Sequence, residues 1–380
     1  MMEAINIFSA TKAKCDSFLE MGVPGFDFLV YRNGEEFFRY TGGYSDLENR
    51  LPMNGREKLR LYSCTKPITV TAAMQLWERG VFSLEDPLYR YLPAYRDMMV
   101  QDGDCLRKAE NPIRIKHLFT MTAGFSYNYK SEALTALRQR NPMPTTRQVI
   151  DALAEDPLMF EPGDQYRYSL CHDVLGALIE VWSGQRLQDY VKDHIFDPLG
   201  MADTCYHAPG DTLAELAPVY RFCKETGERI LQPTQDRVGP CFVSGGGGCI
   251  STAADYMKFA EALRTGERLL KRQTIDLMTQ NHLTEHQKRT FSIKTQDYGL
   301  GMWAPKSGEL RQDFGWGGAG GVLLAVDPGR GLSMVYMQHM LDSPNQGLRG
   351  GLIRTFLTEL EGKMPAAEEN ADYKNYKLTY

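Results

Sequence analysis

The chain of 380 residues is 43% hydrophobic and 24% charged, which is typical of a globular protein and excludes a disordered or fibrous one. This length predicts two domains or one large domain, with a sizeable core. The 43 basic and 48 acidic residues give a net charge of −5 without a strong block of either sign. That balance argues against nucleic acid or an anionic membrane as the main partner.

The sequence contains no apolar run near the roughly 18 residues of a membrane-spanning helix. Residues 1–17 lack the basic stretch and apolar core of a secretion signal. The 8 cysteines form no CxxC pair, so we expect reduced thiols in the core. These features predict a cytoplasmic protein.

The first third of the chain predicts two helices and a hairpin. Apolar residues at helical spacing predict a helix over 8–21. Two apolar segments, 26–31 and 36–40, flank Asn33-Gly34, which is typical of a tight hairpin turn. A second helix is expected over 63–79.

The rest of the chain predicts a helical middle and a mixed C-terminal part. Residues 86 to about 232 have a mostly helical pattern, and helices are also expected at 253–265 and 348–361. Strands are expected at 298–303, 321–326 and 332–338. Strands at both ends predict an α/β domain of residues 1–82 and 233–380, with a mostly helical domain of residues 83–232 inserted in it.

Ser63 and Lys66 form a Ser-x-x-Lys motif at the start of the second predicted helix. Residues three apart lie on one face of a helix, so a neutral lysine amine can reach the serine hydroxyl and act as its base. The motif alone is weak, because Ser9 and Lys12 form a second copy and an N-cap serine beside a solvated lysine gives the same pattern.

Two further segments could contribute to a site. Tyr168 follows a Pro-Gly turn and can project its hydroxyl into a cleft, but most of the 20 tyrosines are expected to be structural. The glycine-rich segment 314–320 can offer N–H groups to an oxyanion, although a tight turn needs the same residues. Its G-x-G-x-x-G spacing does not indicate dinucleotide binding, because it leads into a strand.

His282, Glu285 and His286 match the H-x-x-E-H pattern of zinc proteases. We interpret them as surface residues, because no third ligand is evident, and we predict neither a metal nor a cofactor. The sequence also lacks the G-x-S-x-G elbow that is typical of an α/β-hydrolase.

Taken in order, three motifs resemble those of the serine β-lactamase and penicillin-binding protein superfamily: Ser63-Cys-Thr-Lys66, Tyr168-Ser-Leu170 and Trp316-Gly317-Gly318. The resemblance is nearest to the class C-like branch, with the family VIII carboxylesterases and related acyltransferases. Segments 84–93, 115–124 and 244–256 resemble the same branch. The resemblance implies an α+β, β-lactamase/transpeptidase-like fold, with an antiparallel sheet flanked by helices and an inserted helical domain.

The resemblance also implies a role for each matching residue. Ser63 is expected to be the acylated nucleophile, and Lys66 and Tyr168 are expected to share the general-base work. The backbone N–H groups of Ser63 and Ala319 are expected to form the oxyanion hole. Tyr127, just past the turn at Gly124, is a candidate for either the pocket wall or a structural rim.

Two departures from the family pattern bear on the substrate. Trp316, Gly317 and Gly318 stand where the β-lactamases usually have Lys-Thr-Gly. Leu170 stands where an asparagine is usual, two places after the tyrosine. Both changes remove polar recognition of an anionic antibiotic and leave apolar surface. We therefore expect these residues to contact an uncharged ester with an apolar acyl group.

The sequence thus predicts a cofactor-free serine carboxylesterase that acts on a small-molecule ester through an acyl-enzyme. A β-lactamase or D-amino-peptidase of the same fold, and an acyltransferase that uses the same acyl-enzyme, are the alternatives. A catalytically inactive β-lactam sensor and a metal-dependent hydrolase that uses His282 and His286 come from different classes. The oligomeric state has no signal in the sequence.

Overall fold

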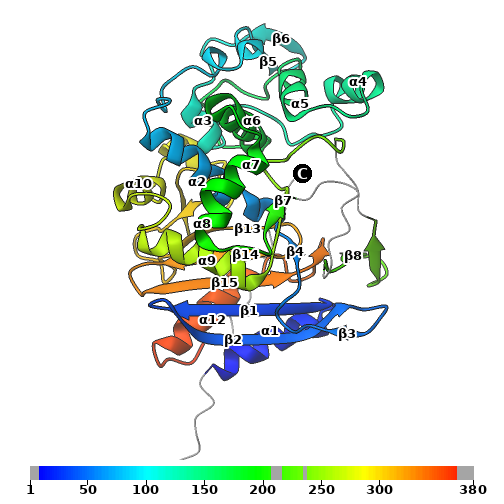
Figure 1. The fold of residues 1–380 in the computed structure, drawn as a ribbon, viewed down its shortest axis with the longest axis vertical. Coiled ribbons are helices and arrows are strands. Elements are labelled where there is room, and N and C mark those ends of the chain that lie inside the picture. The colour runs from blue at the N-terminus through cyan, green and yellow to red at the C-terminus, as the bar shows by residue number, and fades with distance from the viewer. Residues whose placement is uncertain (1–7, 207–215, 234–237, 366–380) are drawn as a thin grey trace, which may run out of the picture.

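The computed structural model describes residues 8–206, 216–233 and 238–365. Within these ranges, eight strands form one antiparallel sheet in the order β11-β12-β13-β14-β15-β1-β2-β3, and its central strands cross the lower half of Figure 1. The strands are β1 (Gly25–Arg32), β2 (Glu35–Asp46), β3 (Leu51–Pro52), β11 (Asp297–Tyr298), β12 (Trp303–Ala304), β13 (Phe314–Gly317), β14 (Leu323–Asp327) and β15 (Leu332–Gln338). Pairing of β1 with β15 joins the two ends of the chain.

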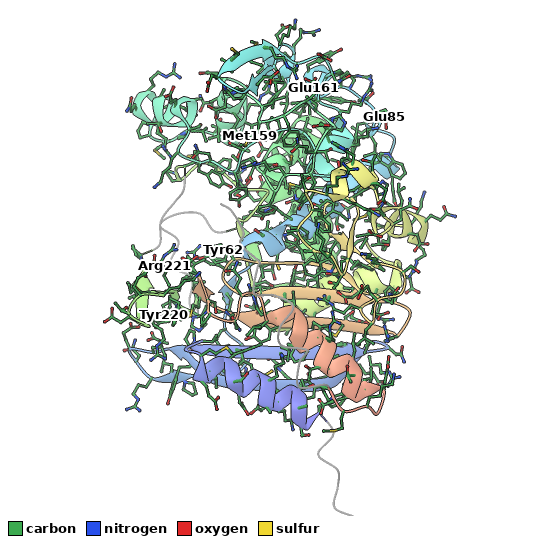
Figure 2. All side chains as sticks on the ribbon, turned by 180° about the vertical axis from the view of Figure 1, so that it is seen from behind. Tyr62, Glu85, Met159, Glu161, Tyr220 and Arg221 are labelled. Carbon is green, nitrogen blue, oxygen red and sulfur yellow. The ribbon has the colours of Figure 1, made fainter. Side chains whose placement is uncertain are left out.

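Helices cover both faces of this sheet, which explains why β14 and β15 are buried along their whole length. Helices α1 (Ser9–Glu20) and α12 (Arg349–Leu360) lie across one face, toward the viewer in Figure 2. Helix α9 (Ala253–Thr265) packs on the other face, against β1, β14 and β15. These three helices agree with the predicted segments. The expected hairpin also forms, with Asn33 and Gly34 at positive φ values of 52° and 91°.

A helical region lies above the sheet in Figure 1, and α2 (Thr65–Glu78) runs between the two. Residues 65–76 of α2 are all buried, as in a helix surrounded by protein. Helix α6 (Cys171–Ser183) packs against it. The other helices are α3 (Ile115–Phe119), α4 (Glu132–Arg140), α5 (Thr146–Leu153), α7 (Leu187–Val191), α8 (Asp197–Leu199), α10 (Arg272–Met278), α11 (Glu285–Lys288) and the short turns η1 (Tyr62–Cys64), η2 (Leu88–Arg90), η3 (Pro93–Tyr95) and η4 (Lys192–Phe196).

Three smaller sheets of the described residues include five strands of the segment for which the sequence predicts mostly helices. The sheets are β4 (Leu59–Arg60) with β10 (Cys249–Ser251) and β7 (Cys205–Tyr206), β16 (Met340–Leu341) with β8 (Val219–Phe222) and β9 (Arg229–Gln232), and β5 (Met99–Asp102) with β6 (Cys105–Lys108). The five strands are β5, β6, β7, β8 and β9. Strands β7 and β8 pair with β10 and β16, so hydrogen bonds link the end of segment 83–232 to segment 233–380. The domain boundaries stay a prediction.

One strand of the C-terminal half differs from the predicted element. The strand expected at 298–303 is divided into β11 and β12, because the chain turns at Gly301, which has a φ of 81°. The glycine-rich segment 314–320 begins as strand β13, paired with β14. A Cβ on Gly315 would lie 2.0 Å from the Leu324 carbonyl oxygen, so this close pairing requires glycine.

The 8 cysteines are free, and Cys64 is completely buried. Burial raises the pKa of the Cys64 thiol to about 12, as expected for an inert core thiol. Across the described ranges, every helix is too short or too polar to cross a membrane. Most of the polar tail 363–380 lies outside the described residues.

Candidate active site

Ser63 lies in η1, the turn that leads directly into α2. Its Oγ lies 2.5 Å from the hydroxyl oxygen of Tyr168 and accepts a 3.3 Å hydrogen bond from Lys66 Nζ. Lys66 follows one helical turn later, as the motif spacing predicts, whereas Tyr168 comes from the segment just before α6. The fold therefore brings these three predicted residues together.

The backbone before Ser63 is held in an uncommon conformation. Tyr62 has a φ of 47°, in the left-handed region that bulky residues rarely adopt. Figure 2 shows this residue between the sheet and the helical region. The glycine-rich loop after β13 packs directly on this turn: a Cβ on Gly318 would lie 2.4 Å from the Leu61 carbonyl oxygen, and one on Gly320 would lie 2.7 Å from the Tyr62 ring. The glycines thus allow the loop to approach Ser63.

Lys66 is completely buried. Its Nζ donates a 2.7 Å hydrogen bond to the Gly246 carbonyl and lies 4.7 Å from the centre of the Tyr168 ring. The Tyr168 ring stacks between Tyr127, at 5.0 Å, and Trp316, at 6.0 Å between ring centres. Tyr127 and Trp316, which were both predicted to contact substrate, therefore fix the orientation of the Tyr168 ring.

Two spaces meet at Ser63 and Ala319, which line both. The smaller one, which we name the tryptophan pocket, has a volume of about 90 Å³. It is lined by Tyr168, Ile293, Gln296, Trp303, Arg311, Trp316, Gly317, Gly318, Leu323, Gln346, Arg349 and Gly350. The larger one, which we name the tyrosine groove, has a volume of about 880 Å³ and includes Tyr62, Tyr127, Tyr129, Tyr206, Phe242 and Leu341 in its walls.

Leu170 does not reach either space, although the sequence predicts that it contacts substrate. Its side chain is 1% exposed and belongs to the hydrophobic core. It is the cap residue of α6, whose first nine residues are all buried, so the start of the helix directs it inward. Gly317 and Gly318, also predicted to contact substrate, line the tryptophan pocket, as does Ala319, the predicted oxyanion-hole residue.

The sequence analysis missed Asp173, a buried carboxylate on α6. It accepts hydrogen bonds from Ser244 Oγ (2.6 Å), the Gly246 N–H (3.2 Å) and the Tyr129 hydroxyl (3.2 Å). A Cβ on Gly246 would lie 2.6 Å from Asp173 Oδ2 and 3.3 Å from Lys66 Nζ, so only glycine fits between these charged groups. An acidic residue in the mostly apolar first half of the helix was the available signal, because a buried carboxylate needs partners.

A second buried acid, Asp313, lies beside the tryptophan pocket and was also missed. Arg311 donates to both of its oxygens, at 2.8 and 2.6 Å, and neither side chain is more than 3% exposed. Trp303 Nε1 donates to the same carboxylate at 3.2 Å. The ion pair therefore holds one wall of the pocket in position.

The histidines of the H-x-x-E-H pattern make other contacts. His282 Nε2 lies 2.7 Å from the Leu277 carbonyl oxygen, and His286 Nε2 lies 3.1 Å from Asp164 Oδ1. Within 8–206, 216–233 and 238–365, no group of three histidine, cysteine or acidic side chains is arranged to hold a metal ion.

An antiparallel sheet flanked by helices, with a Ser-Lys pair opening a buried helix and a tyrosine on the serine, defines the β-lactamase-like serine hydrolase superfamily. The model of the Beta-lactamase family matches residues 8–354, and the chain belongs to this family. The predicted superfamily and its α+β fold are thereby confirmed.

Several known proteins are similar over most of the chain. Protein Rv1367c of Mycobacterium tuberculosis is 31% identical over 329 residues, which cover 79% of this chain and 82% of that protein. Esterase EstB of Burkholderia gladioli is 27% identical over 356 residues, covering 85% and 87%. The solved structure of EstCE1, described as a hydrolase with promiscuous acyltransferase activity, superposes with a TM-score of 0.76 at 26% identity, covering 92% and 98%.

Proposed function

We propose that this protein is a serine carboxylesterase that cleaves small-molecule esters through an acyl-enzyme on Ser63. The observation that carries the proposal is the contact of Ser63 Oγ with both Tyr168 and Lys66, beside two spaces that can receive substrate. The similarity to EstB and EstCE1 supports hydrolysis of esters as the reaction.

In acylation, Ser63 Oγ forms a bond to the ester carbonyl carbon and passes its proton to the Tyr168 phenolate. The charge of Lys66, close to the ring and to Oγ, stabilises that phenolate. The N–H groups of Ser63 and Ala319 hold the oxyanion. When the intermediate collapses, the bond to the alcohol breaks and Tyr168 returns the proton to the alcohol oxygen.

In deacylation, a water molecule takes the place of the alcohol. It gives a proton to Tyr168 as its oxygen bonds to the acyl carbon, and Ser63 Oγ recovers that proton when the acid leaves. The cycle needs no group beyond the side chains of this chain. We propose no metal or cofactor.

Acyl transfer to an alcohol is the second candidate, because EstCE1 combines hydrolase and acyltransferase activities. An alcohol would then replace water in the second step. Product analysis with and without added alcohol separates the two activities.

The test compares the wild type with Ser63→Ala and Lys66→Met on p-nitrophenyl butyrate at neutral pH. Nitrophenolate leaves without a proton, so this ester reports on the nucleophile alone. Ser9→Ala and Lys12→Met, in the second copy of the motif, are the matched controls. We expect each site variant to lose at least about a hundredfold in kcat/KM, and each control to keep its activity.

Full activity of Ser63→Ala would overturn the proposal. A chromogenic cephalosporin, assayed in parallel, tests the β-lactamase alternative: turnover at a rate that rivals the ester would favour that activity instead.

A further inference from the structure

The two spaces at Ser63 are on different sides of the reacting carbonyl. Because Ser63 and Ala319 line both, a carbonyl bonded to Ser63 with its oxygen toward Ala319 has one substituent directed to each space. One substituent is the alcohol of the ester and the other is the acyl chain. One of the two spaces must therefore receive the alcohol and the other the acyl chain.

The position of Tyr168 indicates which space receives the alcohol, because Tyr168 lines the tryptophan pocket and is not among the residues that line the tyrosine groove. An alkoxide needs a proton as it leaves, and the donor must lie within hydrogen-bonding reach of its oxygen. The Tyr168 hydroxyl lies 2.5 Å from Ser63 Oγ, within reach of an oxygen that leaves on the side of the tryptophan pocket. The alcohol therefore leaves into the tryptophan pocket.

The size of this pocket limits the alcohol. A cavity of about 150 Å³ admits benzene, so a volume of about 90 Å³ accommodates a short alkyl group. The walls resist expansion: Trp316 and Leu323 belong to paired strands of the large sheet, and the buried Arg311–Asp313 pair holds Trp303. Arg349 is anchored to the same wall through the Gly318 carbonyl.

We propose that the tryptophan pocket is an alcohol site that selects esters of small alcohols, up to about propyl in size, whose bulkier acyl group lies in the tyrosine groove. The inference rests on the proposed esterase function. The groove, at about 880 Å³ and with Tyr129, Tyr206 and Phe242 in its walls, accepts medium-length alkyl or aryl acyl chains. An acceptor alcohol in acyl transfer enters the same small pocket.

Two series of esters, followed by release of acid, test the assignment. Methyl, ethyl, propyl and hexyl hexanoates vary the alcohol, and methyl acetate, hexanoate and phenylacetate vary the acyl group. Simple alkyl alcohols are similar leaving groups, so differences within the first series report on fit. We expect kcat/KM to fall at least about tenfold between the propyl and hexyl esters, while methyl hexanoate and methyl phenylacetate are cleaved at least as well as methyl acetate.

Ile293→Ala is the informative variant, because Ile293 is half-buried, lines only the tryptophan pocket and lies in the loop between α11 and β11, outside the sheet. It should raise the ratio of hexyl to methyl ester activity about tenfold. Leu341→Ala is the matched control, since it removes a side chain of the same size from the groove. That control should change the acyl series and leave the alcohol ratio as it is.

Each ratio compares two substrates on one enzyme preparation, so partial loss of folded protein cancels. Equal cleavage of methyl and hexyl hexanoate by the wild type would overturn the assignment, as would a shift of the alcohol ratio in Leu341→Ala. The underlying esterase function fails separately, on loss of Ser63-dependent cleavage of p-nitrophenyl butyrate.

Discussion

Two buried aspartates near the site differ in how their charges are compensated. Asp313 meets the guanidinium of Arg311 through two hydrogen bonds. Asp173 is held instead by a hydroxyl, a backbone N–H and a phenol, with Lys66 on the far side of Gly246. A carboxylate that is neutralised by an ion-pair partner mainly stabilises the structure. A carboxylate that is held by neutral donors keeps its charge and therefore also shifts the pKa of ionisable groups around it.

The largest expected effect is on stability, from breaking the Asp313 pair. Removing one partner of a buried ion pair leaves the other charge uncompensated, so Arg311→Met should lower the free energy of unfolding by about 3–5 kcal/mol. Urea denaturation measures the loss. Lys108→Met is the control, because both side chains of its ion pair with Asp97 are exposed and the pair should contribute little to stability.

The double variant Arg311→Met, Asp313→Leu sharpens this prediction, since it leaves no unpaired charge and should recover part of the lost stability. A loss below about 1 kcal/mol in the single variant would show that Asp313 is not maintained as a buried ion.

A smaller effect, on activity, is expected for Asp173→Asn. The amide keeps the size of the side chain and one acceptor oxygen but removes the charge that faces Lys66. Because a hydrogen bond to a charged group contributes about 1.5–3 kcal/mol, kcat should fall about 10- to 100-fold with little change in KM. The other titratable groups around this pair include Tyr127, Tyr129, Tyr168, Tyr206, Cys64, Cys171 and His172.

The pH profile separates a role in positioning and charge from a purely structural one. Removing a negative charge beside Lys66 and Tyr168 makes it easier for this pair to lose the proton that leaves the Tyr168 phenolate. The acid limb of kcat/KM, which reports that loss, should therefore move to lower pH in Asp173→Asn. Asp255→Asn is the matched control, because Asp255 is buried in the first turn of α9 and contacts Thr204 and Lys258. An unchanged profile in Asp173→Asn would leave Asp173 with only a structural role.

These two aspartates also mark the limit of what the sequence predicts. The spacing of Ser63 and Lys66 is local, so one helical turn is enough to bring them together. The position of Tyr168, more than a hundred residues away, followed from the resemblance of ordered motifs rather than from spacing. Asp173 and Arg311 were not identified, because a charged residue is read as exposed until tertiary partners bury it.

The glycine-rich segment left a tight turn open as an alternative, because the close approach of its glycines to β14 is created only by non-local pairing. The error in the tyrosine motif has a local cause. Leu170 was placed in the pocket by its offset from Tyr168, but the start of α6 directs its side chain into the core.

The smallest expected effect concerns His117, a titratable side chain that is buried in its neutral form. Burial, together with the positive charges of Lys116 and Arg114, lowers the pKa of His117 to about 4. Its Nδ1 accepts a hydrogen bond from the Arg114 N–H. The unfolded chain binds this proton near pH 6.5 and the folded chain does not, so stability is complete above that pH and is lost as the pH falls toward 4. Between pH 7 and 5.5 the loss is about 1 kcal/mol.

His117→Asn isolates this contribution, because asparagine can still accept at the start of α3 but does not titrate. Urea unfolding of both proteins at pH 7 and 5.5 should show the wild type losing about 1 kcal/mol more than the variant on acidification. The same difference at both pH values would mean that His117 binds its proton equally well in the folded and unfolded chain. The burial of His117 would then have no electrostatic cost, in contrast to the burial of the two aspartates.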